Sequence, residues 1–259
     1  MALYNAGPGR GPSGRFQAGE TPAFDQEVFR NQTAGTLMCW YRIEAFNLIN
    51  TTSPVINDLT RFSRGTDNSA RLHICMRTND AGATYYPAVF ARRLDSDAAL
   101  SRPGVPNNNP IDGLWHHVAA VAHWDDQLIE LYVDGVFNGS TVVPSWTGAT
   151  SDTPGQGYVG YIGTINNQCA PGTAHADIRA YRRALNAGEI SSIYHARGAD
   201  RVRNGLYHRW PLSGAETDDG FSGGVTFDQG EGRRILGPLF PGPESNLSSP
   251  FNHFGLRGR

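Results

Sequence analysis

The dipeptide Asp134-Gly135 stands between two runs rich in β-branched and other apolar residues, 128–133 and 136–143. A two-residue turn of type I′ requires positive φ at both central positions, which aspartate and glycine tolerate better than most residues. Within the first run every second residue from Ile129 onward is apolar, so these side chains share one face of a strand. The motif therefore predicts an antiparallel hairpin that packs one face into a core.

Similar short runs of β-branched and aromatic residues recur along the chain, separated by segments rich in glycine, proline or asparagine. The predicted strands are 36–43, 53–62, 71–77, 85–93, 115–124, 128–133, 136–143, 158–164, 174–181 and 206–212. Residues 94–113 contain several prolines and asparagines and predict a long loop. About ten short strands at this spacing indicate an all-β fold, an antiparallel β-sandwich.

One short helix is predicted after the strand 174–181. Asn186 suits the N-cap, and Glu189 three residues later completes a capping box. Ile190, Ile193 and Tyr194 then form one apolar stripe at helical spacing. Gly198 is expected to end the helix.

Two of these segments resemble a known family. Trp115-His-His-Val-Ala-Ala-Val-Ala followed by Leu131-Tyr-Val-Asp-Gly resembles the central hairpin of laminin-G-like, concanavalin A-like jelly rolls. Ala174-His-Ala-Asp-Ile-Arg-Ala-Tyr, with the Arg-Ala-Leu bend and helix after it, resembles their penultimate strand and helix. Tyr158-Val-Gly-Tyr-Ile-Gly resembles the glycine-rich strand between them. The resemblance spans roughly residues 30–212 and implies a concanavalin-like jelly roll.

The resemblance also implies positions for single side chains. Trp115 and the odd positions after it are expected to pack between the two sheets. Tyr181 is expected to anchor its strand before the bend, and Leu185 to close one edge of the sandwich.

We divide the chain into an extended N-terminal arm (1–25), a sandwich (26–212) and an irregular C-terminal extension (213–259). The two ends are rich in glycine, proline and arginine and have little capacity to form a core alone. Guanidinium groups suit carboxylates and carbonyls at a protein interface. The arginines expected to make such contacts are Arg10, Arg15, Arg233, Arg234, Arg257 and Arg259.

Charge and composition exclude several functions. All 22 basic side chains are arginine, so chemistry that needs a Schiff-base or phosphate-binding lysine is excluded. The net charge of −2 disfavours nucleic acid as a partner. No run of about 18 apolar residues predicts a membrane span. The first ten residues do not have the pattern of a secretory signal, which favours a cytoplasmic place of synthesis.

Catalytic and metal-binding patterns are weak. Related glycosidases carry Glu-x-Asp-x-x-Glu on one strand; the nearest match here, Glu216-Thr-Asp218-Asp219, falls in a predicted loop. We therefore predict no enzymatic activity. On one strand His117 and His123 lie roughly 20 Å apart, too far to share an ion, and His116 points the other way.

Calcium is the one ion that the resemblance makes plausible, and no other cofactor is expected. Asp125, Asp126 and Asp177 are its candidate ligands. Asp125 and Asp126 equally suit a turn, and Asp177 suits the family strand without metal.

The cysteines Cys39, Cys75 and Cys169 do not form a disulfide framework. Buried reduced thiols are the simpler prediction. A bridge between Cys39 and Cys75 on neighbouring strands is the alternative.

Glycan binding requires aromatic rings that stack on sugar faces. The candidates near loop or strand ends are Tyr85, Tyr86, Trp124 and Trp146. Packing in the core or at its rim is the other role that such aromatics serve.

These observations favour a non-catalytic structural or decoration protein of a large assembly, such as a phage capsid or fibre. Its partners would be identical or foreign subunits held through the arms, and its location the virion. The alternative is a carbohydrate-binding lectin domain, calcium-dependent or not, that recognises a surface glycan outside the cell. A glycoside hydrolase is the third hypothesis.

Overall fold

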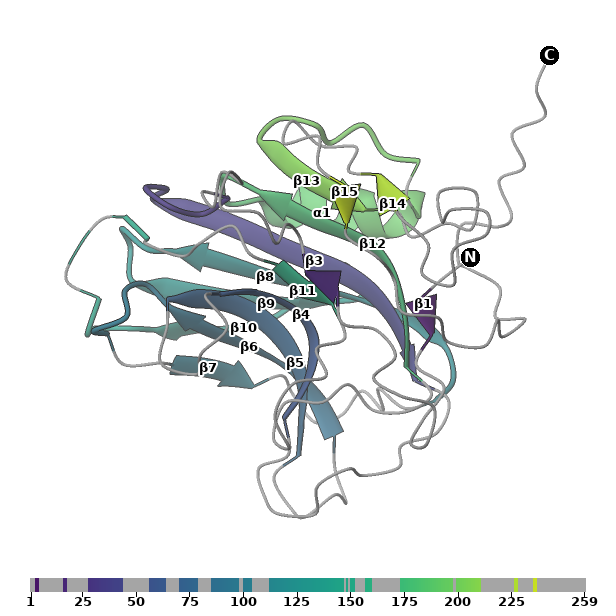
Figure 1. Ribbon diagram of the computed structural model, residues 1–259, viewed down its shortest axis with the longest axis horizontal. Coiled ribbons are helices and arrows are strands. Elements are labelled where there is room, and N and C mark those ends of the chain that lie inside the picture. Colours follow the sequence, from purple (N-terminus) through teal and green to yellow (C-terminus); the bar gives the residue numbers. More distant parts are fainter. Residues whose placement is uncertain are drawn as a thin grey trace.

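Two large antiparallel sheets packed face to face form most of the described part of the chain (Figure 1). The computed structural model describes residues 3–4, 16–17, 28–43, 56–63, 70–78, 85–97, 100–103, 112–146, 148, 150–151, 157–159, 173–197, 199–210, 226–227 and 235–236. The predicted all-β sandwich with one short helix is confirmed.

The first sheet has the order β1-β12-β3-β8-β9-β10, and β13 also pairs with β12. Its strands are β1 (Leu3–Tyr4), β3 (Ala34–Ile43), β8 (Trp115–His123), β9 (Leu128–Val133), β10 (Val136–Val142), β12 (Thr173–Tyr181) and β13 (Leu206–Trp210).

The second sheet has the order β2-β11-β4-β5-β6-β7. Its strands are β2 (Phe16–Gln17), β4 (Ile56–Ser63), β5 (Arg71–Thr78), β6 (Tyr85–Arg92), β7 (Leu100–Pro103) and β11 (Gly157–Val159). β14 (Thr226–Phe227) and β15 (Ile235–Leu236) pair with each other.

The predicted hairpin is present between β9 and β10. Asp134 and Gly135 have φ of 50° and 76°, the positive values that a type I′ turn requires. Strand β7 is the main strand that the sequence misses, because it lies inside the predicted loop 94–113. It is short, stands at the sheet edge and ends on Pro103, and proline is tolerated at an edge.

Helix α1 (Ala187–Ala196) begins as predicted. The Asn186 side chain accepts a hydrogen bond from the Glu189 amide, and the Glu189 side chain accepts one from the Asn186 amide. The last turn is closed by Arg197, which adopts the left-handed conformation with φ of 46°. The predicted stop at Gly198 lies outside the described residues. No helix in the described part of the chain is long and apolar enough to cross a membrane.

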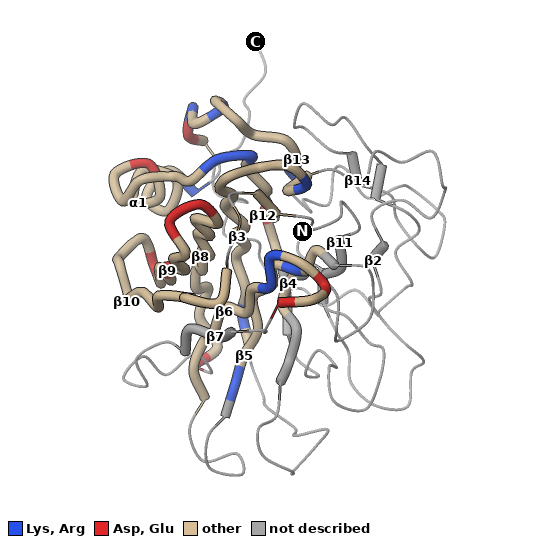
Figure 2. The backbone as a smooth tube through the Cα atoms, turned by 90° about the vertical axis from the view of Figure 1, so that its left-hand side faces the viewer, with Lys and Arg blue, Asp and Glu red and all other residues tan. Residues whose placement is uncertain are grey.

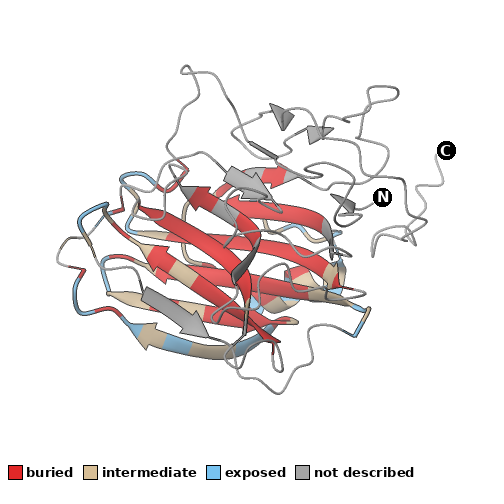
Figure 3. Ribbon diagram, turned by 60° about the horizontal axis from the view of Figure 1, so that its bottom comes forward, coloured by how far each residue is buried: buried red, intermediate tan, exposed pale blue. Residues whose placement is uncertain are grey.

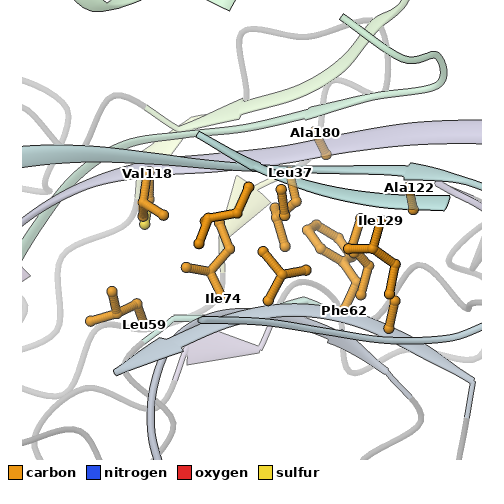
Figure 4. Close-up of a cluster of buried hydrophobic side chains, with 14 of the residues drawn as sticks. Leu37, Leu59, Phe62, Ile74, Val118, Ala122, Ile129 and Ala180 are labelled. Atoms are coloured by element: carbon orange, nitrogen blue, oxygen red, sulfur yellow. The ribbon is translucent and has the colours of Figure 1, made fainter. Parts of the chain in front are cut away.

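The main core lies between the two sheets (Figure 4). Leu37, Val118 and Ile129 from the first sheet meet Leu59 and Ile74 from the second. Buried residues continue along the central strands, whereas exposed ones gather at turns and along β10 (Figure 3).

A second core lies on the other side of the first sheet, under helix α1. Ile190 and Ile193 of the helix pack against Ala119 and Val121 of β8. Strand β8 is therefore buried on both faces. Leu185 and Tyr181, which the family resemblance had placed at the edge and at the strand end, also belong to this cluster.

The predicted facing of β8 was wrong. The even positions Val118, Ala120 and Ala122 point between the sheets, and the odd ones point toward the helix. A strand that is buried on both faces has no alternation of polar and apolar residues to show which side chains point into which core. An error of one residue in the assignment then places every side chain on the opposite face of the sheet.

Cys39 and Cys75 belong to different sheets and are both buried thiols. Cys39 is part of the core between the sheets, whereas Cys75 lies on the outer side of the second sheet and donates from Sγ to the Ala88 carbonyl. The alternative of a Cys39–Cys75 bridge is therefore wrong. Cys169 lies outside the described residues.

Two short pieces of the predicted N-terminal arm join the sandwich. Leu3 pairs with His175 at the edge of the first sheet, and Phe16 pairs with Val159 at the edge of the second. These pieces therefore add strands to the domain's own sheets.

Candidate functional site

The outer face of the second sheet carries the most distinctive set of side chains. Leu72, Ile74 and Met76 of β5 point into the core, so the odd residues of this strand point outward. The outward cross-strand pairs between β5 and β6 are Arg71 with Arg92, His73 with Phe90, Cys75 with Ala88, and Arg77 with Tyr86. We call Arg71, His73, Arg77, Tyr86, Phe90 and Arg92 the arginine–aromatic face.

Phe90 is the centre of this face. The His73 ring stacks on it with centroids 4.9 Å apart and planes inclined by 7°. The Cζ atoms of Arg77 and Arg71 lie 5.3 and 5.9 Å from its centroid. The negative face of an aromatic ring attracts cations at such distances. The Phe90 ring is therefore in contact with two guanidinium groups as well as with the stacked imidazole of His73.

The face is partly accessible. Arg77, Phe90 and Arg92 are half-buried, whereas Arg71 is 8% and His73 3% exposed. Figure 2 marks the arginine residues of β5 in blue. Arginine remains charged throughout the physiological pH range and presents planar donor groups. Strands β5 and β6 therefore offer cationic donors beside an aromatic ring, and they contribute no carboxylate to this face.

The outer face of the first sheet is different. There helix α1 lies over β3, β8 and β9, and apolar side chains such as Met38 and Ile190 fill the contact. The two outer faces of the sandwich therefore have different roles, one covered by the helix and the other rich in arginine.

The four aromatic residues predicted to stack on a sugar are buried. Tyr85, Trp124 and Trp146 lie in the core between the sheets, and Trp124 packs against Phe29 at 5.7 Å between ring centroids. Tyr86 lies on the arginine–aromatic face but is 1% exposed. Side chains that are at most 6% exposed have no free ring face for a sugar, so the expectation is wrong for these residues. They serve the packing role that the sequence also allowed.

A sequence signal for the arginine–aromatic face did exist. In 71–77 every odd residue is polar or cysteine and every even one is apolar. Such alternation predicts a strand with one face outside the core. Phe90 lies inside its strand, whereas the aromatic residues predicted to bind a sugar stand near loop or strand ends.

The histidines of β8 do not converge on a common ion. His116 contacts Asp134 from Nδ1 at 2.8 Å and Asp112 from Nε2 at 3.1 Å. His123 lies 3.5 Å from Glu130. Within the described residues no group of three histidine, cysteine, aspartate or glutamate side chains is placed to hold a metal ion.

Asp177 is not available as a calcium ligand, because two guanidinium groups already bind it. Arg179 Nε donates to its Oδ2 at 2.9 Å, and Arg209 Nε donates to its Oδ1 at 2.7 Å. Burial raises the pKa of Asp177, but the charges and hydrogen bonds of Arg179 and Arg209 outweigh burial and lower the pKa to about 2. The carboxylate is thus ionised and compensated inside the protein.

Asp125 and Asp126 form the turn after β8. Both are exposed, and the Asp126 amide donates to Asp125 Oδ1 at 3.0 Å. This is the turn role that the sequence offered beside calcium. The acidic segment Glu216, Asp218 and Asp219 lies outside the described residues. So do all six arginines predicted to make interfaces, which are Arg10, Arg15, Arg233, Arg234, Arg257 and Arg259.

Comparison with solved structures finds the same fold at low sequence identity. A putative carbohydrate binding protein from Bacteroides ovatus matches with a TM-score of 0.56 and 18% identity, over 86% of this chain and 56% of its own. A heptameric SAP-like pentraxin from Limulus polyphemus matches with a TM-score of 0.52 and 12% identity, over 74% of this chain and 81% of its own. No curated protein sequence matches the chain.

A family model supports the same relationship. The laminin-G-type model of the concanavalin A-like lectin/glucanases superfamily matches residues 17–191. This range includes β3 to β12 and the start of α1, and therefore most of the strands that build the main core. The chain therefore belongs to the concanavalin A-like lectin/glucanases superfamily.

Proposed function

We propose that this protein is a lectin-like carbohydrate-binding domain and that its ligand binds on the arginine–aromatic face. The observation that carries the proposal is the grouping of His73, Arg77 and Arg71 around the Phe90 ring on the sheet face opposite the helix. Family membership and the likeness to a putative carbohydrate binding protein support this class of function.

The chemistry of the face suits a sugar. Sugars present hydroxyl oxygens, which accept hydrogen bonds from guanidinium groups, and apolar C–H faces, which pack on exposed aromatic surface. Arg77 and Phe90 are both half-buried and adjacent, so they offer both kinds of contact at one place. Because β5 and β6 bring no carboxylate pair to the face, we expect binding without hydrolysis.

A glycan array followed by calorimetry tests the proposal. We expect Phe90→Ala and Arg77→Ala each to lower the affinity for the tightest-binding glycan of the array by about tenfold or more, because both side chains would be central contacts of the binding site. The matched controls are Phe137→Ala on exposed β10 and Arg203→Ala in an exposed segment, which should bind like the unchanged protein. An array without any bound glycan, or full binding by Phe90→Ala with its fold intact, would contradict the proposal.

The decoration role is the second proposal. It depends on arms that bind neighbouring subunits, and the arginines expected to do so lie outside the described residues. The pairing of β1 with β12 and of β2 with β11 favours arms that join the domain's own sheets. Location in a virion, or outside a cell, stays a prediction. Mass measurement during size-exclusion chromatography tests the assembly, since a monomer at micromolar concentration contradicts a self-assembling role.

A further inference from the structure

We propose that a stripe of three exposed arginines beside helix α1 binds an acidic segment of a partner protein. Arg197 closes α1, and Arg201 and Arg203 stand in the connection from α1 to β13. We call these three residues the arginine stripe, and all three are exposed. The proposal goes beyond carbohydrate binding, because α1 and β13 belong to the side of the first sheet and the arginine–aromatic face belongs to the second.

The backbone that carries Arg201 and Arg203 is anchored to the domain on its inner side. Asp200 accepts hydrogen bonds from Arg179 at 2.9 and 2.7 Å, and Val202 packs against the core under α1. The Val202 carbonyl also accepts a hydrogen bond from the hydroxyl of the last residue of β12, at 3.0 Å. Because residues 200 and 202 point inward, the exposed residues 201 and 203 point outward on one side.

The turn after Arg203 is held in place as well. The Arg182 amide donates to the Gly205 carbonyl at 2.8 Å, and Arg183 Nε donates to the Asn204 carbonyl at 2.8 Å. A backbone that is fixed at both ends loses little further freedom when a ligand binds its outward side chains. The stripe is therefore pre-organised for binding.

The stripe has no counter-charge in the part of the chain that the structure describes. There, no hydrogen bond or ion pair joins one of its three guanidinium groups to a carboxylate. The carboxylates of α1, of its connection to β13 and of the neighbouring hairpin have other partners, namely Glu189 with Arg183, Asp200 with Arg179 and Asp134 with His116. The stripe therefore presents positive charge on a chain whose net charge is −2.

Stabilisation of helix α1 does not account for the whole stripe. A cation at the C-terminal end of a helix complements the negative end of its dipole, which explains Arg197. This effect falls off within the last turn, and Arg201 and Arg203 stand beyond it. Charges that serve solubility alone are commonly of both signs, whereas the exposed charges here are all positive.

The number and spacing of the guanidinium groups favour a peptide that carries carboxylates. Guanidinium groups bind carboxylates through paired, charge-assisted hydrogen bonds. Residues two apart on an extended chain are about 7 Å apart, so a partner segment with an acidic residue at every second position matches Arg201 and Arg203. Clusters that bind anionic membranes have about four to eight basic residues. The net charge of −2 opposes a long polyanion such as nucleic acid.

Fluorescence anisotropy of labelled peptides titrated with the whole chain tests the proposal. The probes are short peptides in which serine alternates either with glutamate or with glutamine. We expect the glutamate peptide to bind at least about tenfold tighter than the glutamine peptide, and the difference to shrink at high salt. Equal binding of the two peptides, or binding of neither, would overturn the proposal. Tighter binding of phosphatidylserine vesicles or of an oligonucleotide than of the glutamate peptide would also overturn it.

Variants separate the stripe from the net charge of the protein. The double variant Arg201→Gln/Arg203→Gln should lower the affinity for the glutamate peptide by about fivefold or more. Ser140→Glu/Val142→Glu is the matched control, because it changes the net charge by the same amount at exposed positions of β10, far from β13 in the order of the sheet. An equal loss in the control would show that net charge, and not the stripe, attracts the peptide.

The outcome is independent of the proposed function. Glycan binding does not enter this measurement, and the arginine–aromatic face contributes none of the substituted residues. Arg203→Ala therefore stays a control for the glycan experiment, and either proposal can fail while the other stands.

Discussion

His116 and His117 are neighbours on β8 but occupy opposite environments. His116 lies between the carboxylates of Asp134, 2.8 Å away, and Asp112, 3.1 Å away. His117 is buried on the helix side of the sheet, with its ring centroid 5.3 Å from that of Trp40. Adjacent strand residues point to opposite faces, so one histidine is charge-paired and the other is desolvated.

His116 is expected to stabilise the fold most at low pH. Burial lowers its pKa, but the hydrogen bonds and charges of Asp134 and Asp112 outweigh burial and raise the pKa above 6.5. A raised pKa gives a contribution that is complete below the unfolded value and is lost as pH rises through the folded value. We expect the free energy of unfolding of the unchanged protein to exceed that of His116→Gln by about 1 kcal/mol at pH 6, and by less at pH 9.

Urea unfolding of both proteins between pH 6 and 9 measures this difference. His195→Gln is the matched control, because His195 is an exposed residue of α1. A difference that does not change with pH would show that His116 acts through packing alone.

His117 is expected to act in the opposite sense. Burial and the charge of Arg179 lower its pKa to about 4. The unfolded chain takes up a proton near pH 6.5 while the folded one resists until about pH 4, so stability is lost as pH falls through this window. A shift of this size corresponds to roughly 3 kcal/mol. His117→Phe, which cannot titrate, should gain stability relative to the unchanged protein by up to that amount between pH 7 and 4.

The readout is again the difference in unfolding free energy, because the other acidic groups contribute equally to both proteins. His117→Asn is a second non-titrating variant that tests the same window with a polar side chain. Parallel pH profiles for the unchanged protein and both variants would refute the effect.

Asp177 should be among the residues most sensitive to substitution. It is 1% exposed, and its carboxylate compensates the positive charges of Arg179 and Arg209. Arg179 Nη1 also donates to Asp200 Oδ1 at 2.9 Å. Loss of one partner leaves buried charge uncompensated, which costs about 3–5 kcal/mol. Asp177 has φ of 41°, and asparagine tolerates such values as aspartate does. Asp177→Asn therefore removes the charge without adding backbone strain.

We expect thermal unfolding of Asp177→Asn at a much lower temperature, or loss of soluble folded protein. Asp126→Asn in the exposed turn is the control and should unfold like the unchanged protein. If both variants unfold at the same temperature as the unchanged protein, the buried network does not stabilise the fold.

Local patterns predicted the elements well. The Asp134-Gly135 turn and the Asn186 capping box each depend on a few adjacent residues, and both are present. The facing of β8 could not be predicted, because α1 covers its outer side and makes both faces apolar. Strand β7 was missed because four residues at an edge ending in proline do not form a distinct pattern.

The candidate site was harder to predict than the fold. The alternation in β5 marks an outward face, but the contact of His73 with Phe90 depends on which strands are neighbours and in what register. Neither is encoded in spacing along the chain. Burial likewise depends on tertiary packing, which is why four plausible aromatic residues proved to be buried.

Gly135 connects the hairpin turn to the helix. A Cβ atom added there would lie 2.9 Å from the Tyr194 Cβ, and the residue has φ of 76°. Gly113 has nearly the same φ, 77°, but an added Cβ meets nothing within 4 Å. Alanine at either position carries the left-handed penalty of about 1–2 kcal/mol, and only Gly135→Ala adds a collision.

We therefore expect Gly135→Ala to lower the free energy of unfolding more than Gly113→Ala, and the excess should depend on Tyr194. Tyr194→Ala removes the atoms beyond Cβ, including the Cδ1 and Cγ atoms that lie 3.0 Å from the added Cβ. In a double-mutant cycle measured by urea unfolding, Tyr194→Ala should reduce the cost of Gly135→Ala and leave that of Gly113→Ala unchanged. Equal costs at both glycines would mean that the turn requires glycine for its backbone conformation alone, without any contribution from the helix packed against it.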